Sequence, residues 1–144
     1  MIRKKGGFIL NVGSMAGMIP SPLLSTYAAS KAFLKSFSLG LSYELASANI
    51  HVQHINTFFV ATAMSKIRKT SWMTPSPHDF VKSVLKQAGS SYDCTPYFSH
   101  AILEWVLGWI PESVLIKQSY KMHVDIRKRA IKKRERIAQE SKKK

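Results

Sequence analysis

Tyr27 and Lys31 are the residues whose types and spacing most directly suggest chemistry. They stand four positions apart, so a helix would place the phenol and the ammonium on one face. A phenol is a weak acid at neutral pH, and a nearby cation stabilises its phenolate form. Tyr27 is therefore a candidate acid or base that gives a proton to a carbonyl oxygen while hydride reaches the carbonyl carbon.

Ser14 stands 13 residues before Tyr27 and adds a second candidate group. It follows residues 8–12, a short apolar run that is typical of a buried strand. In open α/β sheets, sites gather at the carboxyl ends of strands. A hydroxyl there can hold the carbonyl oxygen that Tyr27 protonates, as an oxyanion-type contact. Tyr-x-x-x-Lys spacing alone arises readily by chance. The combination with Ser14 at the end of a predicted strand is much rarer, so the three residues together favour a catalytic site.

The segments around these residues favour an α/β architecture. Residues 25–48 repeat apolar side chains at spacings of three and four, which predicts a helix. Residues 50–55 alternate apolar and polar side chains, which predicts a second strand. Strand, helix and strand in this order form the repeat of a parallel sheet covered by helices.

The rest of the chain predicts mainly helices. Residues 76–88 begin with a Ser-Pro pair that suits a helix start, and glycine follows them. Residues 90–96 are polar and predict an irregular segment. The apolar residues 98–110 predict a core or interfacial helix rather than a membrane span. Residues 112–144 predict one or two polar helices.

The composition is that of a globular protein with a basic end. The chain has 144 residues, of which 45% are hydrophobic and 21% charged, and this balance argues against wholesale disorder. Residues 117–144 hold 12 basic and three acidic side chains. Such a segment is attracted to an anionic membrane surface or to nucleic acid. Because no nucleic-acid motif is present, contact with a membrane surface is the expectation, and a solvated helical extension is the alternative.

Several other residues suggest chemistry less strongly. The single cysteine, Cys94, excludes an internal disulfide, and no cluster has metal-ligand spacing, so no metal is expected. His51 and His54 alternate with apolar positions of the second strand and are expected to be exposed. Trp105 and Trp109 stand four apart; packing against the fold is the expectation, with a substrate tunnel or a membrane interface as alternatives.

Six short segments, taken together, resemble those of one protein family more specifically than any single motif does. They are residues 11–14 (Asn-Val-Gly-Ser), 19–22 (Ile-Pro-Ser-Pro), 25–33 (Ser-Thr-Tyr-Ala-Ala-Ser-Lys-Ala-Phe), 59–62 (Phe-Val-Ala-Thr), 74–83 (Thr-Pro-Ser-Pro-His-Asp-Phe-Val-Lys-Ser) and 98–100 (Phe-Ser-His). On these segments the chain resembles the short-chain dehydrogenase/reductases. Within that family it is most similar to the branch of 17β-hydroxysteroid dehydrogenases and very-long-chain 3-oxoacyl-CoA reductases.

The resemblance implies a fold and a division of the chain. The fold is α/β: the C-terminal part of a Rossmann-type doubly wound parallel sheet, with a basic helical C-terminal extension. Residues 1–116 would form the C-terminal half of a short-chain dehydrogenase/reductase domain, and residues 117–144 the basic helical tail.

The resemblance also implies roles for five residues. Ser14 would bind and orient the substrate carbonyl, and Tyr27 would be the catalytic acid or base. Lys31 would support Tyr27 and bind the cofactor ribose, and Tyr27 would also contact the cofactor. Val60 and Thr62 match the segment that contacts the nicotinamide carboxamide. The implied cofactor is NADPH.

The implied reaction is reduction of a ketone on a lipid-like substrate. The candidates are a 3-oxoacyl-CoA of fatty acid elongation and a 17-oxosteroid. An apolar loop that holds Met64, Ile67, Trp72 and Met73 suits either, and ordinary packing of these side chains is the alternative. The implied location is the endoplasmic reticulum membrane, and the lysines at 142–144 resemble a dilysine retrieval signal. A homodimer is left open as a further expectation.

The sequence departs from the family pattern at two places that concern cofactor binding. Thr57-Phe58 stands where the family has proline, and no Gly-x-x-x-Gly-x-Gly turn occurs in the sequence. That turn is where a helix N-terminus meets the cofactor pyrophosphate. The chain is therefore expected to be a fragment that binds NADPH weakly or not at all. The alternative function is a non-catalytic or truncated relative that acts as a binding or interaction module.

Overall fold

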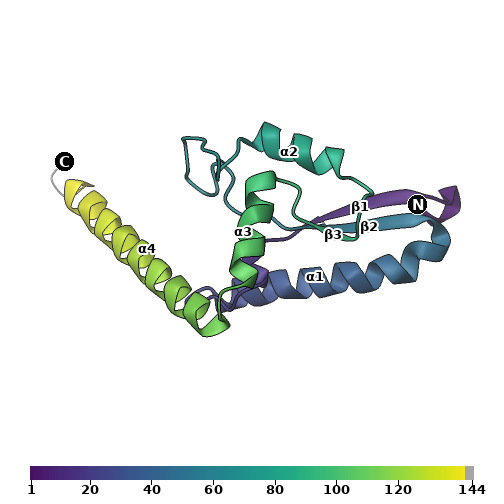
Figure 1. Cartoon of the computed structure of the whole chain (residues 1–144). Helices are drawn as coiled ribbons and strands as arrows, with labels where there is room; N and C mark the ends of the chain where they lie inside the picture. Colours follow the sequence, from purple (N-terminus) through teal and green to yellow (C-terminus); the bar gives the residue numbers. More distant parts are fainter. Residues whose placement is uncertain (142–144) are drawn as a thin grey trace.

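Three parallel strands form one sheet in the order β1-β2-β3 in the computed structural model, which describes residues 1–141 (Figure 1). Strand β1 (Gly7–Val12) pairs with β2 (Ile50–Ile55) along its whole length. Strand β3 (Asp93–Cys94) pairs with the end of β2. The predicted α/β fold is confirmed. The prediction of an irregular segment over residues 90–96 is wrong, because a two-residue strand is too short to show a hydrophobic period.

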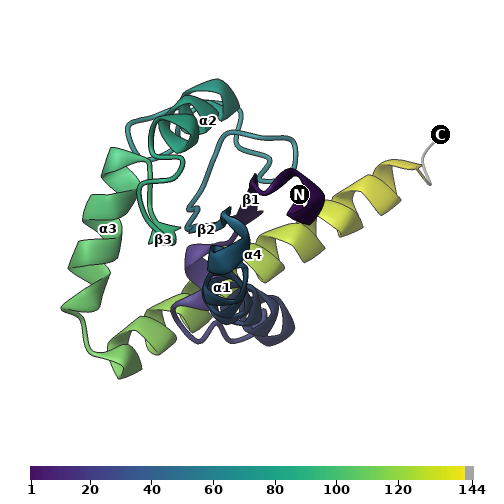
Figure 2. The ribbon, with the colours of Figure 1, turned by 90° about the vertical axis from the view of Figure 1, so that its right-hand side faces the viewer.

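Helices cover both faces of the sheet, as expected for a doubly wound fold. Helix α1 (Ser25–Leu45) connects β1 to β2 and lies on one face, while α2 (Pro77–Lys86) lies on the other (Figures 1 and 2). The predicted stop of the first helix is confirmed: a 3-10 turn (Ala46–Ala48) follows α1, and Asn49 ends it with a left-handed φ of 54°.

The two faces of the sheet are packed differently. On the α2 face, Ile55, Phe80 and Val84 form an apolar cluster. On the α1 face, the buried residues of the helix are small, and they are Ala28, Ser38 and Ser42. Small side chains let the helix approach the strands closely, and the Asn11 side-chain amide of β1 donates to Ser38 Oγ of α1 at 2.9 Å.

Helix α3 (Phe98–Gly108) stands beside the sheet, and α4 (Glu112–Ser141) extends away from it (Figures 1 and 2). Helix α4 has no buried residue and runs unbroken through residues 116 and 117, so the division there stays a prediction. None of the helices within residues 1–141 is both long enough and apolar enough to cross a membrane. The lysines at 142–144 lie outside the described residues.

The tryptophans of α3 do not pack against the fold as predicted. Trp105 and Trp109 are 66% and 75% exposed, and their rings pack edge to face against each other, 5.8 Å between centroids. The helix joins the fold through its N-terminal residues Ser99 and His100, which are buried. Glu104, farther along α3, also bonds Thr95, so the helix still contacts the fold there, and the two tryptophans lie on its exposed side.

Candidate active site

Ser14 occupies a tight turn at the carboxyl end of β1. The Gly13 N–H donates to the Ile55 carbonyl at 2.8 Å, which extends the β1–β2 pairing by one residue. Ser14 then caps a 3-10 turn (Met15–Gly17), and its Oγ accepts a hydrogen bond from the Ala16 N–H at 3.2 Å. Because the hydroxyl accepts from the backbone, its own O–H remains available to donate to a carbonyl oxygen.

Tyr27 and Lys31 lie on one face of α1, as their spacing predicts. The Lys31 Nζ is 5.8 Å from the centroid of the Tyr27 ring and donates to the Val12 carbonyl at 3.2 Å. An ammonium has three N–H donors. Among residues 1–141 the Val12 carbonyl accepts one of them, so two remain for a ligand. Tyr27 is 45% exposed, so a substrate can reach it.

Gly17 holds the Ser14 turn against α1. A Cβ at this position would lie 2.7 Å from the Lys31 carbonyl carbon and 2.8 Å from the Ala32 nitrogen, so the turn and the helix backbone are in direct contact. Glycine is the residue that permits such an approach. The structure thus brings Ser14, Tyr27 and Lys31 to the same end of β1, while their catalytic roles stay predictions.

Val60 and Thr62 lie in the loop that follows β2. The Thr57 carbonyl in this loop accepts the Met15 N–H at 3.0 Å, which ties the loop to the Ser14 turn. Val60 packs against the apolar cluster on the α2 face. The Thr62 N–H donates to Ser65 Oγ at 3.1 Å, so this residue helps to hold the loop together. Contact of Val60 and Thr62 with a cofactor stays a prediction.

The donor set at this edge fits one end of a nicotinamide nucleotide. The Lys31 ammonium and the Tyr27 phenol are the groups that hydroxyls of a ribose would meet. A pyrophosphate needs closely spaced backbone N–H groups at a glycine-rich helix start. The sequence has no Gly-x-x-x-Gly-x-Gly turn, so donors that would meet a ribose are present and the usual turn for the pyrophosphate is absent from it.

A polar network under the site was missed by sequence reasoning. His54 was expected to be exposed, but it is 1% exposed, because it lies on the face of β2 that α1 covers. Its Nδ1 lies 2.8 Å from Asp93 Oδ1, and Lys35 Nζ lies 2.7 Å from Asp93 Oδ2. Burial raises the pKa of Asp93, but the hydrogen bonds from His54 and Lys35 outweigh it and hold that pKa below its usual value.

The loop between β2 and α2 is fastened to the start of α3. Ser99 Oγ donates to the Trp72 carbonyl at 2.7 Å, and His100 Nε2 lies 3.2 Å from the Met73 carbonyl. His100 is fully buried, and burial lowers its pKa. A neutral ring that donates its Nε2–H to Met73 satisfies this geometry. The loop therefore has a fixed anchor, while Trp72 itself is 61% exposed.

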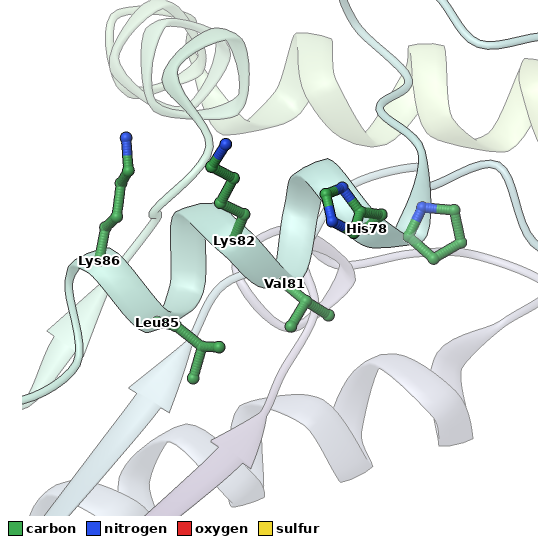
Figure 3. Close-up of a pocket in the computed structure, with 6 residues that line it drawn as sticks. His78, Val81, Lys82, Leu85 and Lys86 are labelled. Carbon is green, nitrogen blue, oxygen red and sulfur yellow. The ribbon is translucent and has the colours of Figure 1, made fainter.

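A hollow of about 680 Å³ lies along α2 and does not involve Ser14, Tyr27 or Lys31. In Figure 3, Val81 and Leu85 project from one side of α2 and Lys82 and Lys86 from the other, and both apolar side chains are more than half exposed. The acid–base group in the lining, His78, is 84% exposed on the surface of the helix. The candidate chemistry therefore remains at the end of β1.

The sequence is similar to those of known proteins over most of its length. A profile of the family described as short chain dehydrogenase matches residues 1–72. The very-long-chain 3-oxoacyl-CoA reductase of Laccaria bicolor is 46% identical over 148 residues, covering 96% of this chain and 44% of the relative. The reductase of the same name from Yarrowia lipolytica is 44% identical, covering 92% of this chain and 36% of the relative. The chain thus spans less than half the length of these curated relatives.

Solved structures support the fold. A structure of a 7β-hydroxysteroid dehydrogenase superposes with a TM-score of 0.65 at 19% identity, covering 81% of this chain and 49% of that one. A short-chain dehydrogenase from Sphingobium yanoikuyae in complex with NADPH gives a TM-score of 0.58 at 23% identity, covering 76% of this chain and 48% of that one. At these identities the likeness establishes the fold alone.

Proposed function

The chain belongs to the short-chain dehydrogenase family, and from that premise we propose that it carries the proton-transfer half of an NADPH-dependent ketone reductase. The observation that carries the proposal is the grouping of Ser14, Tyr27 and Lys31 at the carboxyl end of β1. A hydroxyl, a phenol and an ammonium at one place are the groups that reduction of a carbonyl requires.

Each of the three residues has one task in the proposed reaction. The Ser14 O–H donates to the substrate carbonyl oxygen and holds it in place. Tyr27 gives its phenolic proton to that oxygen as the carbonyl carbon is reduced to an alcohol carbon. Lys31 stabilises the phenolate that remains. The bound nicotinamide nucleotide supplies the hydride, and the ribose hydroxyls would meet Lys31 and Tyr27.

The proposed substrate is a 3-oxoacyl-CoA with a long acyl chain, and a 17-oxosteroid is the second candidate. The names of the curated relatives favour the acyl-CoA. The loop between β2 and α2 also suits a lipid-like molecule, since Met64 and Trp72 are 93% and 61% exposed. A non-catalytic binding module is the weaker alternative, because Ser14, Tyr27 and Lys31 are all present and lie together.

The test uses this chain preceded by the N-terminal part of the Laccaria bicolor relative, which we call the extended protein. Oxidation of NADPH and NADH is followed by absorbance with a very-long-chain 3-oxoacyl-CoA or a 17-oxosteroid. We expect turnover with NADPH and the acyl-CoA. Replacing Ser14 by alanine should lower kcat by about 10²–10³-fold, as the loss of one oxyanion donor does. Absence of turnover with both ketones would reject the proposal.

We also propose that helices α3 and α4 contact an anionic membrane surface. Exposed apolar side chains recur at spacings of four, three and four residues along α3 and its C-cap; they are Phe98, Ile102, Trp105 and, at the C-cap, Trp109. Helix α4, which follows, carries nine basic and four acidic side chains and has no buried residue. Tryptophans beside a basic helix are typical of proteins that lie at the lipid headgroups.

Vesicle binding tests this contact. We expect the chain to sediment with vesicles that contain phosphatidylserine and not with phosphatidylcholine alone, and to be released by salt. Replacing Trp105 and Trp109 by alanine should weaken binding, whereas replacing Trp72 by phenylalanine should not. Equal sedimentation with both vesicles would contradict the proposal. The endoplasmic reticulum membrane and the homodimer remain predictions from the resemblance.

A further inference from the structure

Lys35, Asp93 and His54 form a chain of contacts between α1 and the sheet. The Asp93 carboxylate bridges the other two residues, with distances of 2.7 Å to Lys35 Nζ and 2.8 Å to His54 Nδ1. The three residues come from α1, β3 and β2 respectively. Lys35 stands one helical turn beyond Lys31, so the chain of contacts meets α1 directly next to the candidate site.

The other end of this series of contacts, His54, meets the segment that carries Ser14. A Cβ at Gly13 would overlap with Nε2 of the His54 ring, so the ring lies flush against the Gly13 backbone. Gly13 is the residue immediately before Ser14. His54 is 1% exposed, and the buried Nε2 has no hydrogen-bond partner within residues 1–141. The ring is therefore held by Asp93 alone and supports Gly13 by packing.

Directional contacts matter here because the residues that α1 itself buries are small. The buried residues of α1 are Ala28, Ser38 and Ser42, and small side chains leave a helix free to shift along a strand. Apolar contact is non-directional, whereas hydrogen bonds to charged groups are short and fixed in angle. The Lys35 and Asp93 side chains are only 33% and 26% exposed, so water screens this pair less than a surface pair.

We propose that Lys35, Asp93 and His54 are positioning residues that set the distance between Ser14 and the Tyr27–Lys31 pair. Lys35 fixes the position of α1, and His54 fixes the backbone before Ser14. Asp93 joins the two. The inference rests on the function proposed above, because it concerns the geometry of the same site. Misplacement of a reacting group by about 1 Å can lower the rate about 10²-fold.

The first test uses the 144-residue chain and does not depend on activity. Nuclear magnetic resonance follows the amide signals of Gly13 and Ser14 and the ring signals of Tyr27. Lys35→Met should shift all of them, because α1 and the Gly13 segment move relative to each other. Lys35→Arg keeps a cation near Asp93 and should restore them. Glu44→Gln is the matched control, since Glu44 is an exposed charge on the same helix.

The second test measures turnover in the extended protein. Lys35→Met should lower kcat by about 10–100-fold with little change in KM, because the substrate still binds while the reacting groups are displaced. Lys35→Arg should recover most of kcat, and Glu44→Gln should leave it unchanged. If the unsubstituted extended protein shows no turnover, the proposed function fails, and the resonance test still decides the present inference.

A purely structural role gives a different result. In that case Lys35→Met lowers the unfolding temperature but leaves the Gly13, Ser14 and Tyr27 signals and kcat unmoved, which would overturn the inference. Failure of Lys35→Arg to restore the signals would overturn it as well. Shifted signals that Lys35→Arg restores, with the control unchanged, would support it.

Discussion

At the scale of single residues, Thr57 has a buried hydroxyl without a hydrogen-bond partner among residues 1–141. An unsatisfied buried hydroxyl destabilises a fold by about 1–3 kcal/mol. Replacing Thr57 by valine keeps the shape and removes the hydroxyl, so we expect the free energy of unfolding to rise by about 1 kcal/mol. Urea unfolding monitored by circular dichroism measures this change.

Thr95 provides the opposite case for the same substitution. Its hydroxyl is hydrogen-bonded to Glu104, so Thr95→Val should lower the free energy of unfolding. A stabilising effect at Thr95, or a destabilising one at Thr57, would show that the partners of these hydroxyls differ from those described here.

His100 predicts acid sensitivity. Burial lowers the pKa of its folded form, so the unfolded chain takes up a proton at higher pH than the folded chain does. The stabilising contribution is therefore complete above the unfolded value of about 6.5 and is lost as pH falls below it. We expect His100→Gln to flatten this pH dependence in urea unfolding. An unchanged slope in the variant would mean that His100 is not the titrating group.

The sequence and the structure agree at this scale where the residues are close along the chain. Tyr27 and Lys31 share a face because helical spacing requires it, and Ser14 follows a recognisable strand. His54 and Asp93 were missed, because their contact joins residues 39 positions apart on neighbouring strands. Polar residues in a strand predict exposure, and only the position of α1 shows that His54 is covered.

At the scale of elements, the contact between the Ser14 turn and α1 makes a specific prediction about glycine. Gly17→Ala places a Cβ 2.7 Å from the Lys31 backbone, so the turn or the helix must shift. We expect a loss of about 1–3 kcal/mol in the free energy of unfolding. In the extended protein, kcat should fall as well, because Ser14 moves away from Lys31.

Gly40→Ala is the matched control on α1. Nothing lies within 4 Å of the added methyl group, and alanine is favoured over glycine inside a helix by about 1 kcal/mol. The variant should therefore be more stable than the unsubstituted chain in the same urea experiment. Equal losses at both glycines would contradict the close approach of the turn to α1.

Sequence patterns predicted best the elements that have a clear periodicity of apolar residues or a recognisable capping residue at their start. The bounds of β2 match the predicted 50–55, and Ser76 caps α2 through the Asp79 N–H at 3.1 Å, as its type suggests. Strand β3 could not be found this way, since its two residues are ordered by backbone pairing with β2. Whether residues 98–110 pack or stay exposed also depends on neighbours that a sequence period does not reveal.

At the scale of the whole molecule, Tyr27 and Lys31 would meet the ribose of the proposed cofactor, but the sequence has no glycine-rich turn for its pyrophosphate. We expect the 144-residue chain alone to show no saturable NADPH binding at micromolar concentrations in a fluorescence titration. The extended protein, whose N-terminal part is expected to carry the turn, should bind. Micromolar binding by the 144-residue chain would mean that another part of the chain holds the pyrophosphate.

The most direct measurement of the central claim is the rate of NADPH oxidation by the extended protein with and without the phenolic hydroxyl of Tyr27. Tyr27→Phe removes the proton donor and keeps the ring, so we predict that kcat falls by about 10²–10⁴-fold while the fold and NADPH binding persist. Retention of most of the turnover by the Tyr27→Phe variant would show that another group protonates the ketone, and the account would be wrong.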